Sequence, residues 1–397
     1  MKLENCIVRK WDKIYCELLK QILKEGEEVE NRTGVNTISI EGVNFKLDVQ
    51  EEFPILESKK VVVKNALSEI LWIYQAQSNN VSWLEQRCNP VWNEWKIDED
   101  GIYRTYEPTG EYDPEKEVSI IDLDGNIIYK DSSPYKAKSL IDGKTIKSVK
   151  YFGKEFAGTI GTAYGWINNK FKRPQYVLNT LKSNPNDRRM LISLWQDEYI
   201  KTAVLPSCVW SIEFKVSKGR LNGYVHQRSA DVPLGLPFNV SQYAMLLAVF
   251  AKVSGLEVGN LNYSIMDAHI YINQLEGIKK QLSRYDKMLE IEKESKEIDV
   301  YRKYDELSSK LAYLTTKALT PADWDIIKSL EEEITLYKLM LTKNKPILEL
   351  ANKDDFFKFS NEVNNDKEYL KQNNTGNDDI KILKYSSAPF IKMPITQ

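Results

Sequence analysis

Hydrophobic and polar positions alternate along this chain in two rhythms, and together these rhythms predict a mixed α/β fold. Apolar residues recur every three or four positions in some segments and every second position in others, as on the buried faces of helices and strands. These patterns predict helices over 13–25, 61–75 and 240–254, and strands over 37–47, 190–195, 209–216 and 221–227. The densest apolar runs fall within 164–276, where we expect the main core.

The segment 97–156 differs in texture and is predicted to be a β-hairpin insertion. Asp124-Gly125 and Asp142-Gly143 each lie between β-prone runs within it. Asp-Gly favours a tight hairpin turn because such a turn requires positive φ.

A second unusual segment, 281–342, is predicted to be a helical-hairpin insertion. Its leucines and tyrosines recur at helical spacing in a highly charged background. Thr320, followed by a proline, is typical of a capped helix start. We interpret this segment as a solvated packing or oligomerisation arm, and 384–397 as a separate tail.

Composition indicates a globular, cytoplasmic protein. The 397 residues are 42% hydrophobic and 28% charged, which is enough to form a large core and excludes a disordered or fibrous chain. The formal net charge of −2 gives no reason to expect a nucleic-acid or membrane partner. The four cysteines lack metal-ligand spacing and the N-terminus lacks an apolar signal core, so we expect a reducing compartment and no metal.

Several polar residues suggest a site for a nucleotide. Arg228-Ser229 pairs a guanidinium with a hydroxyl, and Arg188-Arg189 and Arg32 are further candidates to grip a phosphate dianion. Asn239 offers one acceptor and two donors, which suits the edge of a neutral pyrimidine. Cys208 is a candidate nucleophile, since nearby cations favour the thiolate. Taken singly, a cysteine is more often inert packing and an arginine pair more often a solvated surface.

Taken together and in order, these segments resemble thymidylate synthases. The matching segments are Asn31–Gly34, Phe53-Pro54 with Lys59, Glu69–Trp72, Trp92–Trp95, Tyr164-Gly165, Asp187–Arg189, Cys208, Gln227–Asn239, Asp267–Asn273 and Ile391–Ile395. The resemblance covers the chain from Arg32 to Glu276 and again at the tail. The two insertions have no counterpart in the compact members of the family.

The resemblance implies a fold and an assembly. It implies one catalytic domain over 1–397 of the α/β (α+β) class, with a bent mixed sheet at a dimer interface and surrounding helices. In the implied homodimer, Arg188 and Arg189 reach into the partner's site. The tail, 384–397, is implied to close over the bound folate and exclude water.

The resemblance also implies an activity, the transfer of one carbon from 5,10-methylenetetrahydrofolate to C5 of deoxyuridylate (dUMP). Cys208 is implied to add to C6, which makes C5 nucleophilic. The implied catalytic residues are Cys208, Glu69, Asp231 and Tyr164. The implied substrate-binding residues are Arg32, Arg188, Arg189, Gln227, Arg228, Ser229, Asn239, His269 and Tyr271. The implied folate-binding residues are Lys59, Trp92, Trp95, Asp231, Gly235 and Phe238.

Departures from the family pattern bear on the last step of the reaction. Position 209 is Val where the family has His, and Ser207, Pro233, Met266 and Gln397 also differ from the usual residues. We therefore favour hydration of the C5 methylene to 5-hydroxymethyl-dUMP, as in phage hydroxymethylases of this superfamily, acting in the host cytoplasm. The alternative is reductive methylation to thymidylate. An inactive, nucleotide-binding relative is an alternative of a different class.

Overall fold

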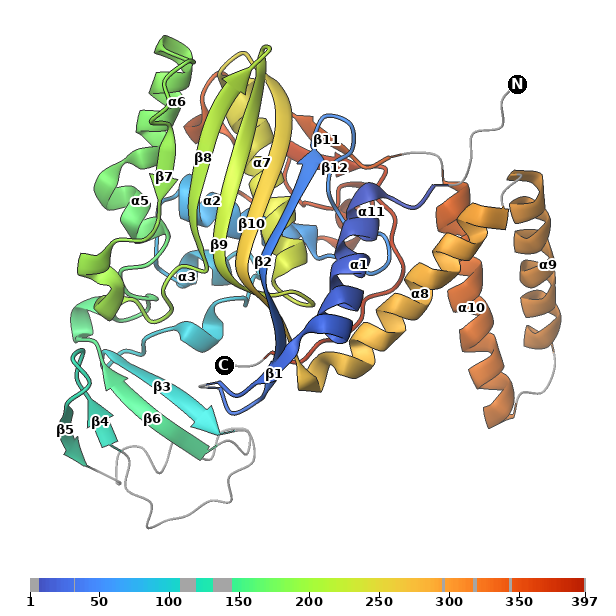
Figure 1. Ribbon diagram of the computed structural model, residues 1–397, viewed down its shortest axis with the longest axis horizontal. Coiled ribbons are helices and arrows are strands. Elements are labelled where there is room, and N and C mark those ends of the chain that lie inside the picture. Colours follow the sequence, from blue (N-terminus) through green and yellow to red (C-terminus); the bar gives the residue numbers. More distant parts are fainter. Residues whose placement is uncertain are drawn as a thin grey trace. The chain divides into compact units, whose positions relative to one another are not determined.

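The computed structural model describes residues 7–31, 33–107, 119–130, 145–294, 297–316, 320–342 and 345–395. The chain forms two compact units (Figure 1). Unit 1 comprises 1–66, 216–360 and 366–396, and unit 2 comprises 67–215 with 361–365. The mixed α/β class predicted from the sequence is confirmed.

A mixed sheet in the order β1-β2-β10-β9 forms the centre of unit 1. Its strands are β1 (Glu27–Val29), β2 (Thr37–Asp48), β9 (Arg220–Asp231) and β10 (Glu257–Tyr271). β2 pairs antiparallel with β1 and β10, whereas β9 and β10 are parallel. Buried and less buried residues alternate along β9, because successive side chains of a strand point to opposite faces.

Two helices pack against this sheet. In α1 (Lys10–Glu25), Trp11, Tyr15, Leu19 and Ile22 form one buried stripe at helical spacing. The helix α7 (Leu236–Val253) packs against β9 and β10 and begins four residues before the predicted start. It is long and apolar enough to cross a bilayer, but 83% of that stretch is buried in the protein, as in the core helix of a globular protein.

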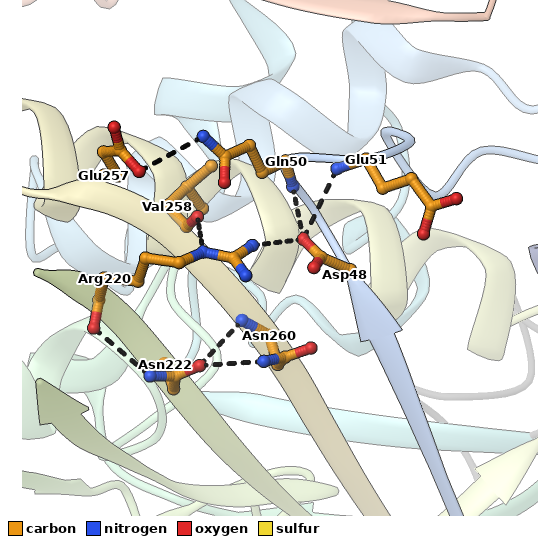
Figure 2. A network of polar contacts seen from close by, with 8 residues as sticks. All are labelled: Asp48, Gln50, Glu51, Arg220, Asn222, Glu257, Val258 and Asn260. Atoms are coloured by element: carbon orange, nitrogen blue, oxygen red, sulfur yellow. Dashed lines mark hydrogen bonds and ion pairs between the residues drawn. The ribbon is translucent and has the colours of Figure 1, made fainter. Parts of the chain in front are cut away.

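A polar network lies where β2 ends and where β9 and β10 begin (Figure 2). Arg220 donates to the Asp48 carboxylate and, through Nε, to the Val258 carbonyl at 3.1 Å. The Asn222 Oδ1 accepts from the backbone N–H and the side-chain amide of Asn260 at 2.9 and 3.1 Å. These contacts lie at the irregularity in pairing between Val258 and Leu261. Beyond it, the register places Ser229 opposite Asp267 and Asp231 opposite His269.

The helical insertion contains three helices rather than the predicted two, namely α8 (Leu275–Glu294), α9 (Glu297–Thr315) and α10 (Pro321–Leu341). α8 continues directly from the end of β10, and α10 lies between α8 and α9 (Figure 1). The predicted cap is confirmed, since the Thr320 hydroxyl accepts from the Asp323 N–H at 3.3 Å. The remaining elements of unit 1 are β11 (Ile347–Leu350), α11 (Lys367–Gln372) and β12 (Ile380–Leu383).

Unit 2 carries two groups of strands and several short helices. Its helices are α3 (Ser82–Glu85), α5 (Gly165–Phe171) and α6 (Arg173–Ser183), and α2 (Val63–Tyr74) leads into it from unit 1. β7 (Leu191–Ser193) pairs antiparallel with β8 (Val209–Ser217). β8 then leads along the chain into β9. The predicted strand over 190–195 is therefore present but shorter.

A separate four-stranded sheet forms within the predicted β insertion. Its order is β3-β6-β4-β5, from β3 (Ile102–Glu107), β4 (Ser119–Ile121), β5 (Ile127–Lys130) and β6 (Thr145–Tyr151). Gly125, with φ of 89°, lies in the turn between β4 and β5, so the predicted Asp124-Gly125 hairpin is confirmed. The second predicted turn, Asp142-Gly143, lies outside the described residues.

Candidate functional site

In unit 2, Cys208 lies immediately before β8 and is partly buried. Its backbone N–H donates to the Tyr164 hydroxyl at 3.0 Å. Tyr164 is buried and adopts a positive φ of 47° at the start of α5, a conformation rare for a bulky residue. The next residue must be glycine, because a Cβ on Gly165 would lie 2.0 Å from the Ser78 carbonyl oxygen. The backbone therefore holds Tyr164 where it orients the Cys208 segment.

Three more of the predicted catalytic and folate-binding residues join this group. The Trp92 indole N–H donates to the Glu69 carboxylate at 2.7 Å. The Trp92 ring contacts the rings of Tyr164 and Trp95, with centroids 5.3 and 5.5 Å apart. Glu69 comes from α2 and is partly buried. Five residues predicted from four separate motifs thus form one connected group, with a cysteine, a carboxylate and three aromatic rings.

The predicted phosphate arginines of unit 2 lie elsewhere on its surface. Arg188 and Arg189 are exposed in the loop before β7. Arg189 donates to Asp187 at 2.7 Å, and this hydrogen bond lowers the pKa of Asp187 to about 2. These side chains are therefore accessible to an anion from outside the chain. Arg32, the third candidate, lies outside the described residues.

In unit 1, a chain of amides fixes the orientation of Asn239. The Tyr263 hydroxyl donates to Gln227 Oε1 at 2.5 Å, and Gln227 Nε2 donates to Asn239 Oδ1 at 3.3 Å. Asn239 Nδ2 in turn donates to Gln242 Oε1 at 3.2 Å. Gln227 Nε2 also donates to the Ser229 carbonyl at 2.9 Å, and because a carbonyl can only accept, this bond fixes the Gln227 amide and places the oxygen of Asn239 toward it. An oriented amide of this kind can distinguish the donors and acceptors on a base edge.

A second polar group of unit 1 joins Ser229 and His269 through Asp267. The Asp267 carboxylate accepts from the Ser229 hydroxyl at 2.9 Å and lies 3.2 Å from His269 Nδ1. Burial opposes ionisation of Asp267, but the hydrogen bonds from His269 and Ser229 outweigh it and lower its pKa. His269 also contacts the Tyr271 ring edge to face, with centroids 5.3 Å apart. Arg228, between Gln227 and Ser229, is partly buried on β9 and also favours ionisation of Asp267.

The predicted folate residues of unit 1 gather around the end of β9. Asp231 accepts from the Leu234 N–H and from Gln274 Nε2, both at 3.0 Å. Burial raises the pKa of Asp231 in spite of these hydrogen bonds. The buried Lys59 ammonium donates to the Pro233 carbonyl, and burial lowers the pKa of Lys59 to about 8.

Gly235 and Phe238 follow Asp231 along the chain. The Gly235 N–H donates to the Asp231 carbonyl at 2.8 Å, and Phe238 is partly buried in the first turns of α7. Gly235 therefore lies against the Asp231 backbone, and Phe238 follows it in α7. Among the described residues, no three His, Cys, Asp or Glu side chains gather as a metal site requires.

Gln274 was not predicted from the sequence, although it touches Asp231. Its Nε2 also donates to the Pro394 carbonyl at 3.2 Å, and its Oε1 accepts from the Tyr271 N–H at 3.1 Å. One buried amide thus connects Asp231 with the C-terminal segment. Its position three residues after Tyr271, where a glutamine can cap the start of a helical segment, is the one local signal that could have identified it.

Comparison with known proteins agrees with this fold. The sequence profile of the thymidylate synthase family matches residues 13–312. The thymidylate synthase of Clostridium beijerinckii is 34% identical over 274 residues, which cover 69% of this chain and 82% of the relative. That of Oenococcus oeni is 36% identical over 282 residues, covering 68% and 85%. Thermostable thymidylate synthase A from Bacillus subtilis matches the fold with a TM-score of 0.59 and 23% identity, over 98% of this chain and 99% of that one.

The chain therefore belongs to the thymidylate synthase family. It is an enzyme of the one-carbon transferase class, as the sequence predicted. The predicted thymidylate-synthase fold is confirmed as well.

Proposed function

We propose that the protein transfers one carbon from 5,10-methylenetetrahydrofolate to C5 of dUMP. The observation that carries this proposal is the connected group of Cys208, Tyr164, Trp92 and Glu69 in a chain of this family. The Cys208 thiolate adds to C6 of the uracil, and the electron pair of the C5–C6 bond moves to make C5 nucleophilic. Bound folate supplies the carbon. Glu69 and Tyr164 then take part in the proton transfers that remove the proton from C5 and return a proton to the ring.

Several polar side chains hold the nucleotide. Arg32, Arg188, Arg189 and Arg228 bind the 5′-phosphate together with Ser229, because guanidinium groups bind such dianions through paired hydrogen bonds. Asn239, oriented by Gln227, reads N3 and O4 of uracil. His269 and Tyr271 hold the 3′-hydroxyl.

The folate is bound by Asp231, Lys59, Trp92, Trp95, Gly235 and Phe238. The partly buried Asp231 carboxylate with a raised pKa suits a hydrogen-bonding partner on the pterin edge. The Trp92–Trp95 pair suits an aromatic ring. Gln274 orients Asp231.

For the product, we propose 5-hydroxymethyl-dUMP. Elimination of tetrahydrofolate leaves an exocyclic methylene on C5. Water adds to this methylene, and the bond between Cys208 and C6 then breaks. This proposal depends on the departures from the family pattern beside the nucleophile, where the buried Val209 replaces a histidine. The alternative, hydride transfer to give thymidylate, is supported by the names of the relatives.

We further propose that the protein acts as a cytoplasmic homodimer in which Arg188 and Arg189 serve the partner's site. Tyr224 and Met266 lie on one face of the unit 1 sheet and are 39% and 64% exposed. Large apolar side chains exposed on a sheet face are typical of a surface that another subunit covers.

The proposed reaction is tested with Cys208→Ala and a matched control, Cys88→Ala. Tritium release from 5-tritiated dUMP with methylenetetrahydrofolate is expected from the wild type and from the control, whose thiol is exposed. Cys208→Ala is expected to abolish release while dUMP binding stays within about tenfold, or about 1.4 kcal/mol. No release from the wild type would support the inactive-relative alternative.

The product is tested in the same reaction. Dihydrofolate absorbance and the mass of the nucleotide are followed together. The proposal expects a hydroxymethyl product with no dihydrofolate, whereas stoichiometric dihydrofolate with thymidylate would establish the alternative.

A further inference from the structure

The helical insertion meets the rest of unit 1 through a buried guanidinium. Arg284, on α8, has a side chain only 3% exposed. Its Nε donates to the Glu332 carboxylate on α10. Its Nη1 donates to the carbonyls of Ser58 and Pro389 at 3.3 and 2.8 Å. One side chain therefore connects an inserted helix, the loop before Lys59 and the C-terminal segment.

The two segments that Arg284 connects are also bonded to each other. The Ala388 N–H donates to the Glu57 carbonyl at 2.7 Å, and the Tyr385 hydroxyl donates to the Leu56 carbonyl at 2.9 Å. Lys59, at the end of this loop, reaches the Pro233 carbonyl near Asp231. The loop and the C-terminal segment therefore form one layer next to the proposed folate residues.

Electrostatics make Glu332 important to this arrangement. A buried guanidinium is costly unless its charge is balanced and its N–H groups are bonded. The Ser58 and Pro389 carbonyls accept hydrogen bonds but carry no net charge, whereas Glu332 supplies a negative one. Its carboxylate is 30% exposed and also pairs with Lys280 at 3.3 Å. Neutralising Glu332 removes this balance without leaving a cavity.

We propose that Glu332 is a positioning residue for the folate half of the reaction. Through Arg284, it holds the Lys59 loop and the C-terminal segment together, so an inserted helix takes part in folate binding. This inference rests on the proposed function, because that function assigns both segments to the folate. It replaces our interpretation of the insertion as a solvated arm.

The chain offers a matched control in the neighbouring residue. Glu333 lies on the same helix, is also 30% exposed and also pairs with a lysine of α8, Lys287, at 3.2 Å. In steady-state kinetics of the full chain, Glu332→Gln is expected to raise KM for methylenetetrahydrofolate about five- to tenfold. In this variant we expect kcat and KM for dUMP to stay within about twofold of the wild-type values. Glu333→Gln is expected to match the wild type, and Glu332→Asp to bring KM for methylenetetrahydrofolate back toward the wild-type value.

A second measurement does not depend on turnover. Carboxypeptidase digestion of the ligand-free protein reports how firmly the C-terminal segment is held, and we expect release to be about fivefold faster in Glu332→Gln than in Glu333→Gln. If no protein turns over but Glu332→Gln alone speeds release, the reaction assignment fails and the connection through Arg284 stands. Equal release and equal folate KM in the two variants would overturn the inference.

Discussion

The charged side chains that join the two insertions to the protein differ in burial. The helical insertion is joined to unit 1 through buried groups, of which Arg284 with Glu332 is one. Arg9 is another, since this buried residue of the N-terminal segment donates to the Thr342 carbonyl just after α10 at 3.3 Å. The four-stranded insertion, by contrast, reaches a neighbouring segment of unit 2 through Lys201 and Asp124, which are 69% and 63% exposed.

The β insertion does have a buried charge of its own, and that charge pairs with a carboxylate of the same segment. Arg104 on β3 is 8% exposed and pairs with Asp98, six residues earlier. The difference shows that the part of the protein that an ion pair affects depends on the segments that it joins. We expect changes in the helical insertion to affect the folate side of unit 1, and changes in the β insertion to remain local.

The largest effect is expected from Arg284→Met. This substitution removes the donor to the Ser58 and Pro389 carbonyls and leaves Glu332 without its buried partner. We expect the free energy of unfolding to fall by about 2–4 kcal/mol. Urea unfolding followed by circular dichroism measures it, and a loss below about 0.5 kcal/mol would show that the helical insertion is attached in another way.

Arg104→Met makes the corresponding change in the β insertion. We expect a loss of about 1–3 kcal/mol that is confined to this sheet, because Arg104 and Asp98 both belong to the segment 97–156. Hydrogen exchange should speed up in β3 and β6, while KM for both substrates stays unchanged. A raised folate KM would break the comparison between the two insertions.

Glu57 makes the attachment of the helical insertion depend on pH. It pairs with Arg9, yet burial is the larger influence and raises the pKa of Glu57 from 4.5 to about 8. Between these values the folded protein retains a proton that the unfolded chain has released. Stability therefore falls as pH rises through this window, by at most about 1.4 kcal/mol per pH unit.

The test compares urea midpoints of the wild type and Glu57→Gln at pH 5, 6.5 and 8. Since glutamine does not titrate, the urea midpoint of the variant should depend less on pH. Relative to the wild type, it should rise toward pH 8. Parallel profiles for the two proteins would assign the pH dependence to other groups.

Much of the fold was predictable because local patterns determine it. The buried stripe of α1, the alternation along β2 and β9, the Thr320 cap and the Asp124-Gly125 turn are all contained within short windows. The boundary between β10 and the insertion was not predictable. The helix α8 begins at Leu275, before the predicted start of the insertion at 281, and its helical pattern has no break that marks this boundary.

The site divides in the same way. Cys208, Tyr164, Glu69 and Trp92 were found because their motifs resemble a family, and the structure connects them. Glu332 had no such signal. Its bond to Arg284 joins residues 48 positions apart, and one glutamate among many on a charged helix gives no sign of a distant partner. Pairings of this kind depend on the tertiary fold and are invisible to sequence spacing.

The smallest effect is expected from Lys201→Met, which removes the ion pair between Asp124 of the β insertion and the segment before β8. Both partners are mostly exposed, so water and salt screen their attraction and their side chains lose freedom when they pair. We expect the urea midpoint of unfolding to stay at the wild-type value at low and at high salt. The measurement is informative because it has a counterpart in Arg284→Met, which also removes one cation between an insertion and its unit. A fall in the urea midpoint as large as that of Arg284→Met would mean that exposed pairs attach the β insertion as firmly as a buried guanidinium attaches the helices.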